Sequence, residues 1–469
     1  MSRLSPIRVA PGGRYFETFD GEPFLFLGPN DAVSWPSLNG LYRRKGIAGV
    51  EAYLQDMAEN GVNILRVMLE YAHVNTRFFE RPVGRFNPPM VRLWDDLFER
   101  CERFGLRVLL APWDNYWMAT RWHHHPYNVA NGGPAQSLQA FFTEEATIAA
   151  TIRRLQFVAE RWGGCGAFAA WDLFNEIHPN YGGTPKQQGA VIARISDAVR
   201  EVEMRCWGYT RPQTVSIFGP EPKGDYEQLV FRHPNLDFAS THIYHRRGID
   251  RPTNTVVPAL TMAQYVRYGL QRTPSDRPFT DTEHGPINLF NNLNRMMTEK
   301  FDDEYERHMM WAHLASGGAG CGMRWPARRP HVLTAGTRRS IGAMAGFIKH
   351  VEWLRFAQQD AVADIQVATQ SIEVFACRDD QQAIVWLLRG VPKRHHGTLP
   401  PREPLHDVGV TIRGLLPGHY SVMQWDTRKG VCIGRMHVRS DRTRRLRFAL
   451  PSLGNDMALA VRRAAAQGA

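Results

Sequence analysis

The sequence predicts an α/β protein with a (β/α)8 TIM barrel at residues 1–350 and a C-terminal antiparallel β-sandwich domain at residues 351–469. Three observations support this prediction. Short apolar runs suited to buried parallel strands recur along the first part, segments of helical periodicity separate them, and the pattern changes to short alternating runs after about residue 350. A chain of 469 residues also exceeds what one ordinary core accommodates, so two domains are expected.

Eight apolar runs form the predicted barrel strands. They are residues 24–28, 63–69, 107–113, 168–174, 213–218, 238–244, 278–283 and 320–325. The amphipathic stretches between them end at or near glycine, as helix C-termini commonly do. A doubly wound sheet is the alternative, but it would use fewer strands and a glycine-rich first turn, and GPND at 28–31 is not GxGxxG. The alternation therefore favours the barrel.

The segment beyond residue 350 has a different pattern. FIKHVEWLRF is predicted as the last barrel helix, and the runs that follow it are short, alternating and separated by Gly, Pro and Asp turns. The polar, proline-rich stretch at 392–407 is expected to be an exposed connection. This sandwich could serve as a structural buttress or as an accessory sugar site.

Composition excludes several classes of protein. No apolar run reaches the roughly 18 residues of a membrane span, and the N-terminus lacks the apolar core of a secretory signal, so a cytoplasmic protein is expected. The six cysteines show no CxxC spacing, which argues against a disulfide scaffold or a zinc ribbon. The net charge is +11, but the basic residues are dispersed, and nucleic-acid binding is not predicted. The oligomeric state is not predicted.

Polar and aromatic residues cluster at the C-terminal ends of the predicted strands. In a barrel these ends converge on one open face, where catalytic groups lie. Asp172 and Asp281 precede the strand ends and are expected to point into the barrel or toward helices, so neither is assigned a role. The strand-end residues are Asn30, Arg66, Trp113, Asp114, Asn175, Glu176, His242, Tyr244, Glu283, His284, Arg324 and Trp325.

Glu176 and Glu283, at the fourth and seventh strand ends, suit the cleavage of a glycosidic bond. That chemistry needs two carboxyl groups, one that protonates the leaving oxygen and one that attacks or activates water. A separation of about 5 Å would dictate a covalent intermediate and retention of configuration. No metal or other cofactor is required, because the two carboxyl groups and water are sufficient.

The motifs LRVM, NE, HIY, TEHG and RW on successive strands resemble those of clan A glycoside hydrolases, particularly the family 5 type of cellulases and mannanases. The resemblance extends over roughly residues 15–345 and includes the opening RYFETFDGEPFLFLGPN. It implies that Glu176 is the acid/base and Glu283 the nucleophile. It further implies that Asn175 binds the sugar 2-hydroxyl and that Arg66 and Tyr244 contact the nucleophile. His242 would line the side of the acid/base, and Trp325 would form the floor of the sugar subsite.

The third strand end departs from this family pattern. Family 5 enzymes usually place a histidine there, whereas this chain has Trp113 and Asp114, which are predicted to bind substrate in an altered subsite. In the clan, the bond after the floor tryptophan is often cis. Proline lowers the cost of a cis bond to about 0.5–1 kcal/mol, so a cis Trp325–Pro326 bond is predicted.

Two rim loops carry further candidates. The run RWHHHPYN at 121–128 is not predicted to bind metal, because three consecutive histidines do not easily converge on one ion. Trp117, Trp122, Tyr127 and one of these histidines are instead predicted to form a sugar-facing wall. The basic rim residues could be ordinary solvated surface or could hold an acidic sugar. They are Arg246, Arg247, Arg328 and Arg329.

The sequence thus predicts a retaining glycoside hydrolase that cleaves a β-linked oligosaccharide or polysaccharide, with an acidic glycan among the candidate substrates. Two alternatives remain open: a glycan-binding protein that has lost turnover, and a transglycosylase of glycan assembly. The identity of the sugar, its linkage and exo or endo action are not predicted.

Overall fold

The computed structural model describes residues 4–30, 41–70, 77–177, 181–287, 297–326, 332–369, 371–392 and 394–464. The chain begins with a small antiparallel sheet of β1 (Ile7–Val9), β2 (Phe16–Thr18) and β3 (Pro23–Phe24). This sheet leads directly into an extended segment that contains Phe26 and Asn30.

Parallel pairings join eight segments of the chain into a closed ring. The named strands are β4 (Ile64–Met68), β5 (Arg107–Ala111), β6 (Phe168–Asp172), β7 (Gln213–Thr214), β8 (Ala239–His242) and β9 (Phe279–Glu283). β4 to β7 pair in order, and β8 pairs with β9. Parallel bridges complete the ring between Phe218 and His242, His284 and Arg324, Gly320 and Phe26, and Asn30 and Arg66. This is the strand order expected of the predicted barrel.

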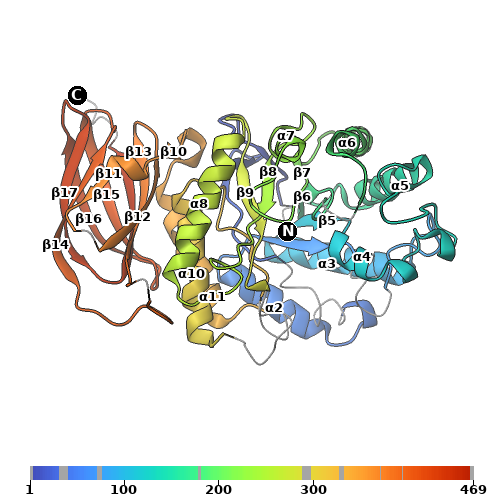
Figure 1. The fold of residues 1–469 in the computed structure, drawn as a ribbon, viewed down its shortest axis with the longest axis horizontal. Helices are drawn as coiled ribbons and strands as arrows, with labels where there is room; N and C mark the ends of the chain where they lie inside the picture. Colours follow the sequence, from blue (N-terminus) through green and yellow to red (C-terminus); the bar gives the residue numbers. More distant parts are fainter. Residues whose placement is uncertain are drawn as a thin grey trace.

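One major helix follows each segment of the ring. These helices are α2 (Ile47–Glu59), α3 (Pro88–Phe104), α5 (Glu145–Trp162), α6 (Pro185–Trp207), α7 (Asp225–Arg232), α8 (Val256–Arg272), α10 (Glu299–Ala315) and α11 (Ala335–Phe347) (Figure 1). The long loop after β5 adds α4 (Asn115–Thr120), η1 (Trp122–His124) and η2 (Val129–Asn131). Of the helices in the described ranges, none combines the length and apolar character that a bilayer crossing demands.

The barrel strands are apolar on both faces because side chains fill the ring and helices cover its outside. Every residue of β4, β5, β6 and β8 is buried. Such continuous burial is typical of parallel strands. The C-terminal ends of these strands lie at one rim of the ring, where loops replace the helical cover.

The C-terminal part is one continuous antiparallel sheet rather than two separate ones. Its strand order is β10-β12-β13-β18-β15-β16-β17-β14-β11. The strands are β10 (Gln359–Asp360), β11 (Ile365–Val367), β12 (Ile372–Arg378), β13 (Gln382–Arg389), β14 (Leu405–Arg413), β15 (Gly418–Asp426), β16 (Val431–Ser440), β17 (Arg445–Leu453) and β18 (Asp456–Arg463). Short 3-10 helices precede or join them: η4 (Ile348–His350), η5 (Trp353–Arg355) and η6 (Val362–Asp364).

The sheet curves around a core of its own. β16 and β17 pair at a single position, Ser440 with Leu446, so the sheet bends there. Strands from both sides of the bend contribute to one buried cluster that includes Val385, Val410 and Val422. The predicted sandwich is therefore a single folded sheet, because strand pairing across the bend is a non-local property that alternating patterns do not encode.

The outer face of this sheet packs against the barrel. Phe375, Trp386 and Trp425 belong to the same buried cluster as the barrel core. The Trp425 indole N–H donates to the carbonyl of Ala343 on α11 at 3.2 Å. Figure 1 shows the sheet at one end of the molecule, next to α10 and α11.

Candidate active site

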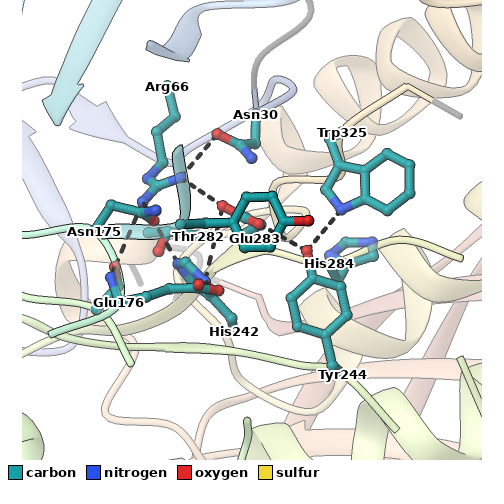
Figure 2. A network of polar contacts seen from close by, with 12 residues as sticks. Asn30, Arg66, Asn175, Glu176, His242, Tyr244, Thr282, Glu283, His284 and Trp325 are labelled. Carbon is teal, nitrogen blue, oxygen red and sulfur yellow. Dashed lines mark hydrogen bonds and ion pairs between the residues drawn. The ribbon is translucent and has the colours of Figure 1, made fainter. Parts of the chain in front are cut away.

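Glu176 and Glu283 meet at the open rim of the ring. One carboxylate oxygen of each lies within 4.8 Å of the other, and a ring nitrogen of His242 lies within the same distance of both. Glu283 is the last residue of β9, His242 is the last residue of β8, and Glu176 lies just beyond β6 (Figure 2). Two residues that lie 107 positions apart in the sequence (283 − 176) thus form one carboxyl pair.

Glu283 accepts two strong hydrogen bonds. Arg66 donates from Nη1 to Oε2 at 2.9 Å, and Tyr244 donates its hydroxyl to Oε1 at 2.7 Å. The Tyr244 oxygen in turn accepts the indole N–H of Trp325 at 2.7 Å, which directs the tyrosine hydrogen toward the carboxylate. Burial raises the pKa of Tyr244 well above its usual range, so the hydroxyl stays a donor. Both oxygens of the Glu283 carboxyl group are thus held by hydrogen-bond donors.

Glu176 has the environment of a proton donor. Burial raises the pKa of Glu176 to about 7, although the positive charge of Arg66 opposes this shift. Burial also lowers the pKa of His242 to about 4, so the imidazole is neutral at neutral pH. His242 Nδ1 lies 2.7 Å from Glu176 Oε1, and its Nε2 faces Arg66 Nη2, an N–H donor, at 3.5 Å. A neutral ring therefore carries its hydrogen on Nδ1 and donates to Oε1, which leaves the carboxyl proton on Oε2.

The backbone of Glu176 is held in a left-handed conformation, with φ of 51°. Such a conformation is unfavourable for a non-glycine residue and persists only where the surroundings fix it. The Asn115 side-chain amide donates to the Glu176 carbonyl, and the Glu176 N–H donates to the Ser216 hydroxyl at 3.2 Å. These two contacts turn the chain sharply after Phe174 and aim the carboxyl group into the rim.

Arg66 connects most of the site. Its guanidinium donates to Asn30 at 2.9 Å and to Asn175 at 2.6 Å, in addition to Glu283. Asp172, which was expected to point either into the barrel or toward a helix, points into the barrel and accepts a hydrogen bond from Arg66 Nη2 at 2.6 Å. No role for Asp172 was predicted from the sequence. The signal that could have found it is charge balance, because a fully buried guanidinium needs a buried counter-charge.

Asn175 and Asp114 form the next part of the rim. The Asn175 side-chain amide donates to Asp114 Oδ1 at 3.1 Å while its oxygen accepts from Arg66. Asp114 also caps α4 by accepting the Tyr116 N–H at 3.1 Å. Burial raises the pKa of Asp114 to about 7, and the charges of Glu283 and Glu176 add to the shift. The site therefore holds a third carboxyl group with a raised pKa.

Trp113 does not reach the site, contrary to the prediction. Its indole is 1% exposed and lies beneath the guanidinium of Arg154, 3.9 Å from the ring centroid. Tyr127 and Phe141 pack edge-on against it at 4.9 and 5.0 Å. Trp113 belongs to a core inside the long loop after β5, since successive side chains at a strand end point to opposite sides.

The predicted sugar-facing wall is also only partly accessible. Tyr127 and His125 are buried, and His125 Nε2 lies 3.1 Å from Glu70. Trp122 stacks on His125 with ring centroids 5.6 Å apart. The described loop thus uses Tyr127 and His125 to build its own core around Arg154, which pairs with Glu70 at 3.0 Å.

Trp325 lies against the carboxyl pair from the eighth segment. Its indole passes so close to Gly285 that a Cβ there would lie 2.5 Å from the indole. The predicted cis Trp325–Pro326 bond is wrong: the cis bond among the described residues is Arg81–Pro82. Proline reduces the preference for trans without reversing it, and the indole reaches Tyr244 without a cis bond.

The basic rim residues fall into two groups. Arg246 and Arg247 are exposed in the loop that follows Tyr244. Arg328 and Arg329 lie outside the described residues. Arg324, at the eighth strand end, turns away from the site and pairs with Asp302 and Glu306 on α10. His284 likewise faces inward, where Asp281 binds its Nδ1.

Glu176, His242 and Glu283 are close enough to hold a metal ion, and within the described ranges they form the one such group. Their environment does not suit a cation. Both oxygens of Glu283 already accept hydrogen bonds, and the fixed positive charge of Arg66 lies 2.9 Å away and would repel a metal ion.

The ring and its paired carboxyl groups define the class of the protein, which is a glycoside hydrolase of the clan A type that the motifs resemble. Residues 10–328 match the family described as Apiosidase-like, catalytic domain, and the chain belongs to that family. No sequence among the curated proteins is similar enough to match the chain.

Solved structures share the fold at low sequence identity. One is described as a glycoside hydrolase, with a TM-score of 0.62 and 15% identity over 98% of this chain and 97% of that one. A family 5 glycoside hydrolase from Bacteroides vulgatus has a TM-score of 0.61 and 14% identity over 97% and 93%. A family 5 mannosidase from Rhizomucor miehei has a TM-score of 0.51 and 16% identity over 69% and 86%. The similarity to the first two structures extends over the C-terminal sheet as well.

Proposed function

We propose that the protein is a retaining β-glycosidase that cleaves a β-linked oligosaccharide or polysaccharide by double displacement. Residues 1–350 would form the catalytic (β/α)8 barrel, and residues 351–469 an accessory domain that buttresses α10 and α11. The proposal rests on one distance: a carboxyl oxygen of Glu176 and a carboxyl oxygen of Glu283 lie within 4.8 Å of each other. Retaining enzymes place the two carboxyl groups about 5–5.5 Å apart, whereas inverting enzymes need about 6.5–9.5 Å.

In the first step, Glu283 attacks the anomeric carbon while the bond from that carbon to the leaving oxygen breaks. Glu176 transfers its proton to the leaving oxygen. Arg66 and Tyr244 hold the Glu283 carboxyl group by two hydrogen bonds, and the pKa of Glu176, raised to about 7, leaves the acid largely protonated below neutral pH. The two carboxyl groups therefore differ in the way that this step requires.

In the second step, water attacks the anomeric carbon of the glycosyl–enzyme ester, the bond from that carbon to Glu283 breaks and frees the carboxylate, and Glu176 accepts a proton from the attacking water. Ester formation removes one negative partner of Arg66, so the guanidinium acts more strongly on Glu176 and favours its ionised form. The same residue can thus serve first as the acid and then as the base.

Three residues are proposed to bind the sugar whose glycosidic bond is cleaved, and a fourth to orient the acid. Asn175 would donate to the 2-hydroxyl, Asp114 would accept from another hydroxyl, and Trp325 would form the floor. His242 would orient Glu176, from which it lies 2.7 Å. Trp113 is not included, because it is buried within the loop core.

The sugar itself is a finer proposal. The family name points to an apioside, and the Rhizomucor miehei structure is a mannosidase, so aryl β-apiosides and β-mannosides are the first substrates to test. Arg246 and Arg247, exposed three residues or fewer beyond Tyr244, would favour a substrate that carries a carboxylate. Replacing both with serine should lower activity on acidic oligosaccharides and leave neutral ones unchanged.

A panel of 4-nitrophenyl β-glycosides tests the main proposal. The wild-type enzyme should release nitrophenol from at least one of them, and E283Q should release none. Proton NMR of the first product should show the β-anomer, and a 2-deoxy-2-fluoro glycoside should attach covalently to Glu283, as mass spectrometry of peptides would detect. An α-anomer as first product would contradict the double displacement.

Two alternatives from the sequence are separated by the same experiments. A glycan-binding protein without turnover would bind oligosaccharides and release no nitrophenol. A transglycosylase would form longer oligosaccharides from the donor in preference to the free sugar. The presence of both carboxyl groups in mutual reach favours turnover.

A further inference from the structure

Phe218 is an exposed aromatic residue at the active rim that the mechanism above does not use. It ends the fifth segment of the ring, where it pairs with His242, and the His242 N–H donates to the preceding Ile217 carbonyl at 3.0 Å. Its side chain is 48% exposed. A single exposed apolar side chain is ordinary on a protein surface, but one at the rim of this site is placed where aromatic side chains commonly line a ligand-binding cleft.

The position of Phe218 places it next to both carboxyl groups. Its ring stacks on Tyr244, with ring centroids 5.1 Å apart and an interplanar angle of 25°. Tyr244 donates to Glu283. Two residues before Phe218, on the same side of the segment, the Ser216 hydroxyl accepts the N–H of Glu176. Phe218 therefore borders the side of the site where the proton donor lies.

Exposure increases outward along this row of aromatic side chains. Trp325 and Tyr244 are each 7% exposed, which suits the floor of an enclosed sugar subsite. Phe218, next to Tyr244, is the exposed end of the row. A ring bound against Phe218 would lie outside the enclosed subsite and closer to solvent.

A second exposed aromatic residue lies on the other side of the segment that carries Glu176. Tyr116 is 54% exposed and is the second residue of α4. Its neighbour Asn115 donates to the Glu176 carbonyl, so the start of α4 is fixed against the acid/base residue. The third and fifth segments thus each present an aromatic side chain beside the fourth, which bears Glu176.

We propose that Phe218 is the platform of a leaving-group subsite, with Tyr116 as its opposite wall, and that this subsite takes a ring-shaped aglycone by its apolar face. The inference rests on the proposed function and specifies the substrate of the same site. Glu176 must deliver its proton to the oxygen of the leaving group, so that group lies on the Glu176 side. An aromatic face there stacks on the C–H face of a sugar or on an aryl ring.

The test compares two kinds of substrate with the same glycosyl group. One kind has a ring as leaving group: the 4-nitrophenyl β-glycoside on which the wild type is most active, and the matching β-linked disaccharide. The other is the β-glycosyl fluoride, which has no ring to stack and needs no proton from Glu176. For F218A, kcat/KM should fall about 10- to 50-fold on the ring-bearing substrates, mostly through KM. The fall on the fluoride should be several times smaller.

Matched variants make the result specific. F218W should keep kcat/KM on the ring-bearing substrates close to that of the wild type. Y116A should lower kcat/KM on the same substrates by a smaller factor than F218A. F19A is the control, because Phe19 is also exposed, at 37%, but packs against Tyr209 on the chain that enters β7 from the opposite end of the ring. F19A should leave both kinds of substrate unchanged. A larger effect on the disaccharide than on the nitrophenyl glycoside would identify the aglycone as a sugar, and the reverse as an aryl group.

Two outcomes would overturn the inference. An equal loss on the fluoride would mean that Phe218 only supports Tyr244 and the nucleophile, and no loss on any substrate would mean that it contacts no aglycone. Failure of the proposed function is distinguishable from both, because then the wild type itself would turn over neither the fluoride nor the glycosides.

Discussion

Arg66 and Asp172 form an ion pair inside the ring, where Nη2 and Nε of Arg66 lie 2.6 and 3.1 Å from the same carboxylate oxygen. Neither side chain is exposed to solvent. Arg66 can therefore hold Glu283 from Nη1 because its other two nitrogens are fixed from within the barrel. The geometry of the proposed nucleophile depends on a residue that does not itself face the substrate.

Loss of Asp172 should reduce both stability and turnover. Removing one partner of a buried ion pair typically costs about 3–5 kcal/mol, since the other charge stays buried and unpaired. We expect D172A to lower the free energy of unfolding by that amount in urea titrations and D172N to lower it less. S216A, which removes a hydrogen bond to Asp172 at 3.0 Å and the acceptor of the Glu176 N–H, should cost less, about 1.5–3 kcal/mol. Equal effects of D172A and S216A would contradict this account of Arg66.

The second prediction concerns the pH dependence of turnover. Glu176 must be protonated to act as an acid, and its pKa is raised to about 7, so kcat/KM should fall as the pH rises through about 7. In E176A this basic limb should disappear, and activity should survive only on substrates with a good leaving group such as 2,4-dinitrophenol.

Asp114 makes a control necessary, because its pKa is also raised to about 7. D114N should keep the basic limb and lose activity through KM if Asp114 only binds a hydroxyl. A limb that vanishes in D114N and persists in E176A would assign the titration to Asp114 instead.

The third prediction concerns Tyr244. A hydrogen bond to a charged group contributes about 1.5–3 kcal/mol. Y244F, which removes the donor 2.7 Å from Glu283, should therefore lower kcat about 10- to 100-fold with little change in folding stability. W325F removes only the indole N–H that binds the Tyr244 oxygen, so its effect on kcat should be smaller. A larger effect of W325F would mean that the indole position matters more than the tyrosine donor.

The sequence allowed the ring and most of the rim to be predicted because both follow local patterns. Apolar runs of strand length located the segments, and the rule that strand ends converge located Arg66, Asn175, Glu176, His242 and Glu283. In the structure Arg66 and His242 each contact a carboxyl group, and the roles of the five residues stay predictions.

Other features depend on partners far away in the sequence. Asp172 pairs with Arg66, which lies 106 positions earlier in the sequence. Trp113 packs under Arg154 in a loop core. Neither placement could be predicted from the neighbouring residues in the sequence. Phe218 was visible as the end of an apolar run, but its exposure depends on how the neighbouring loops fold. The single folded sheet at the C-terminus likewise depends on pairing between strands that are not consecutive.

The fourth prediction concerns the contact between the barrel and the C-terminal sheet. Asp456 at the start of β18 binds Arg307 of α10 at 2.7 Å, and both side chains are buried. Burial alone would raise the pKa of Asp456, but Arg307 outweighs it and lowers the pKa to about 2. At neutral pH, D456N should lower the free energy of unfolding by about 3 kcal/mol, because it leaves the buried Arg307 unpaired.

The pH dependence of this loss follows from the lowered pKa of Asp456. A carboxyl group with a depressed folded pKa contributes stability above its unfolded pKa of about 3.9 and loses it as the pH falls through the folded value. The stability difference between wild type and D456N should therefore be constant above about pH 5 and shrink progressively toward pH 2 and below. R428S is the matched control, since Arg428 pairs with Glu304 across the same contact at 3.1 Å but is half exposed. Its loss should be under about 1 kcal/mol. A difference that does not shrink on acidification would show that the contact between the two parts does not depend on the charge of Asp456.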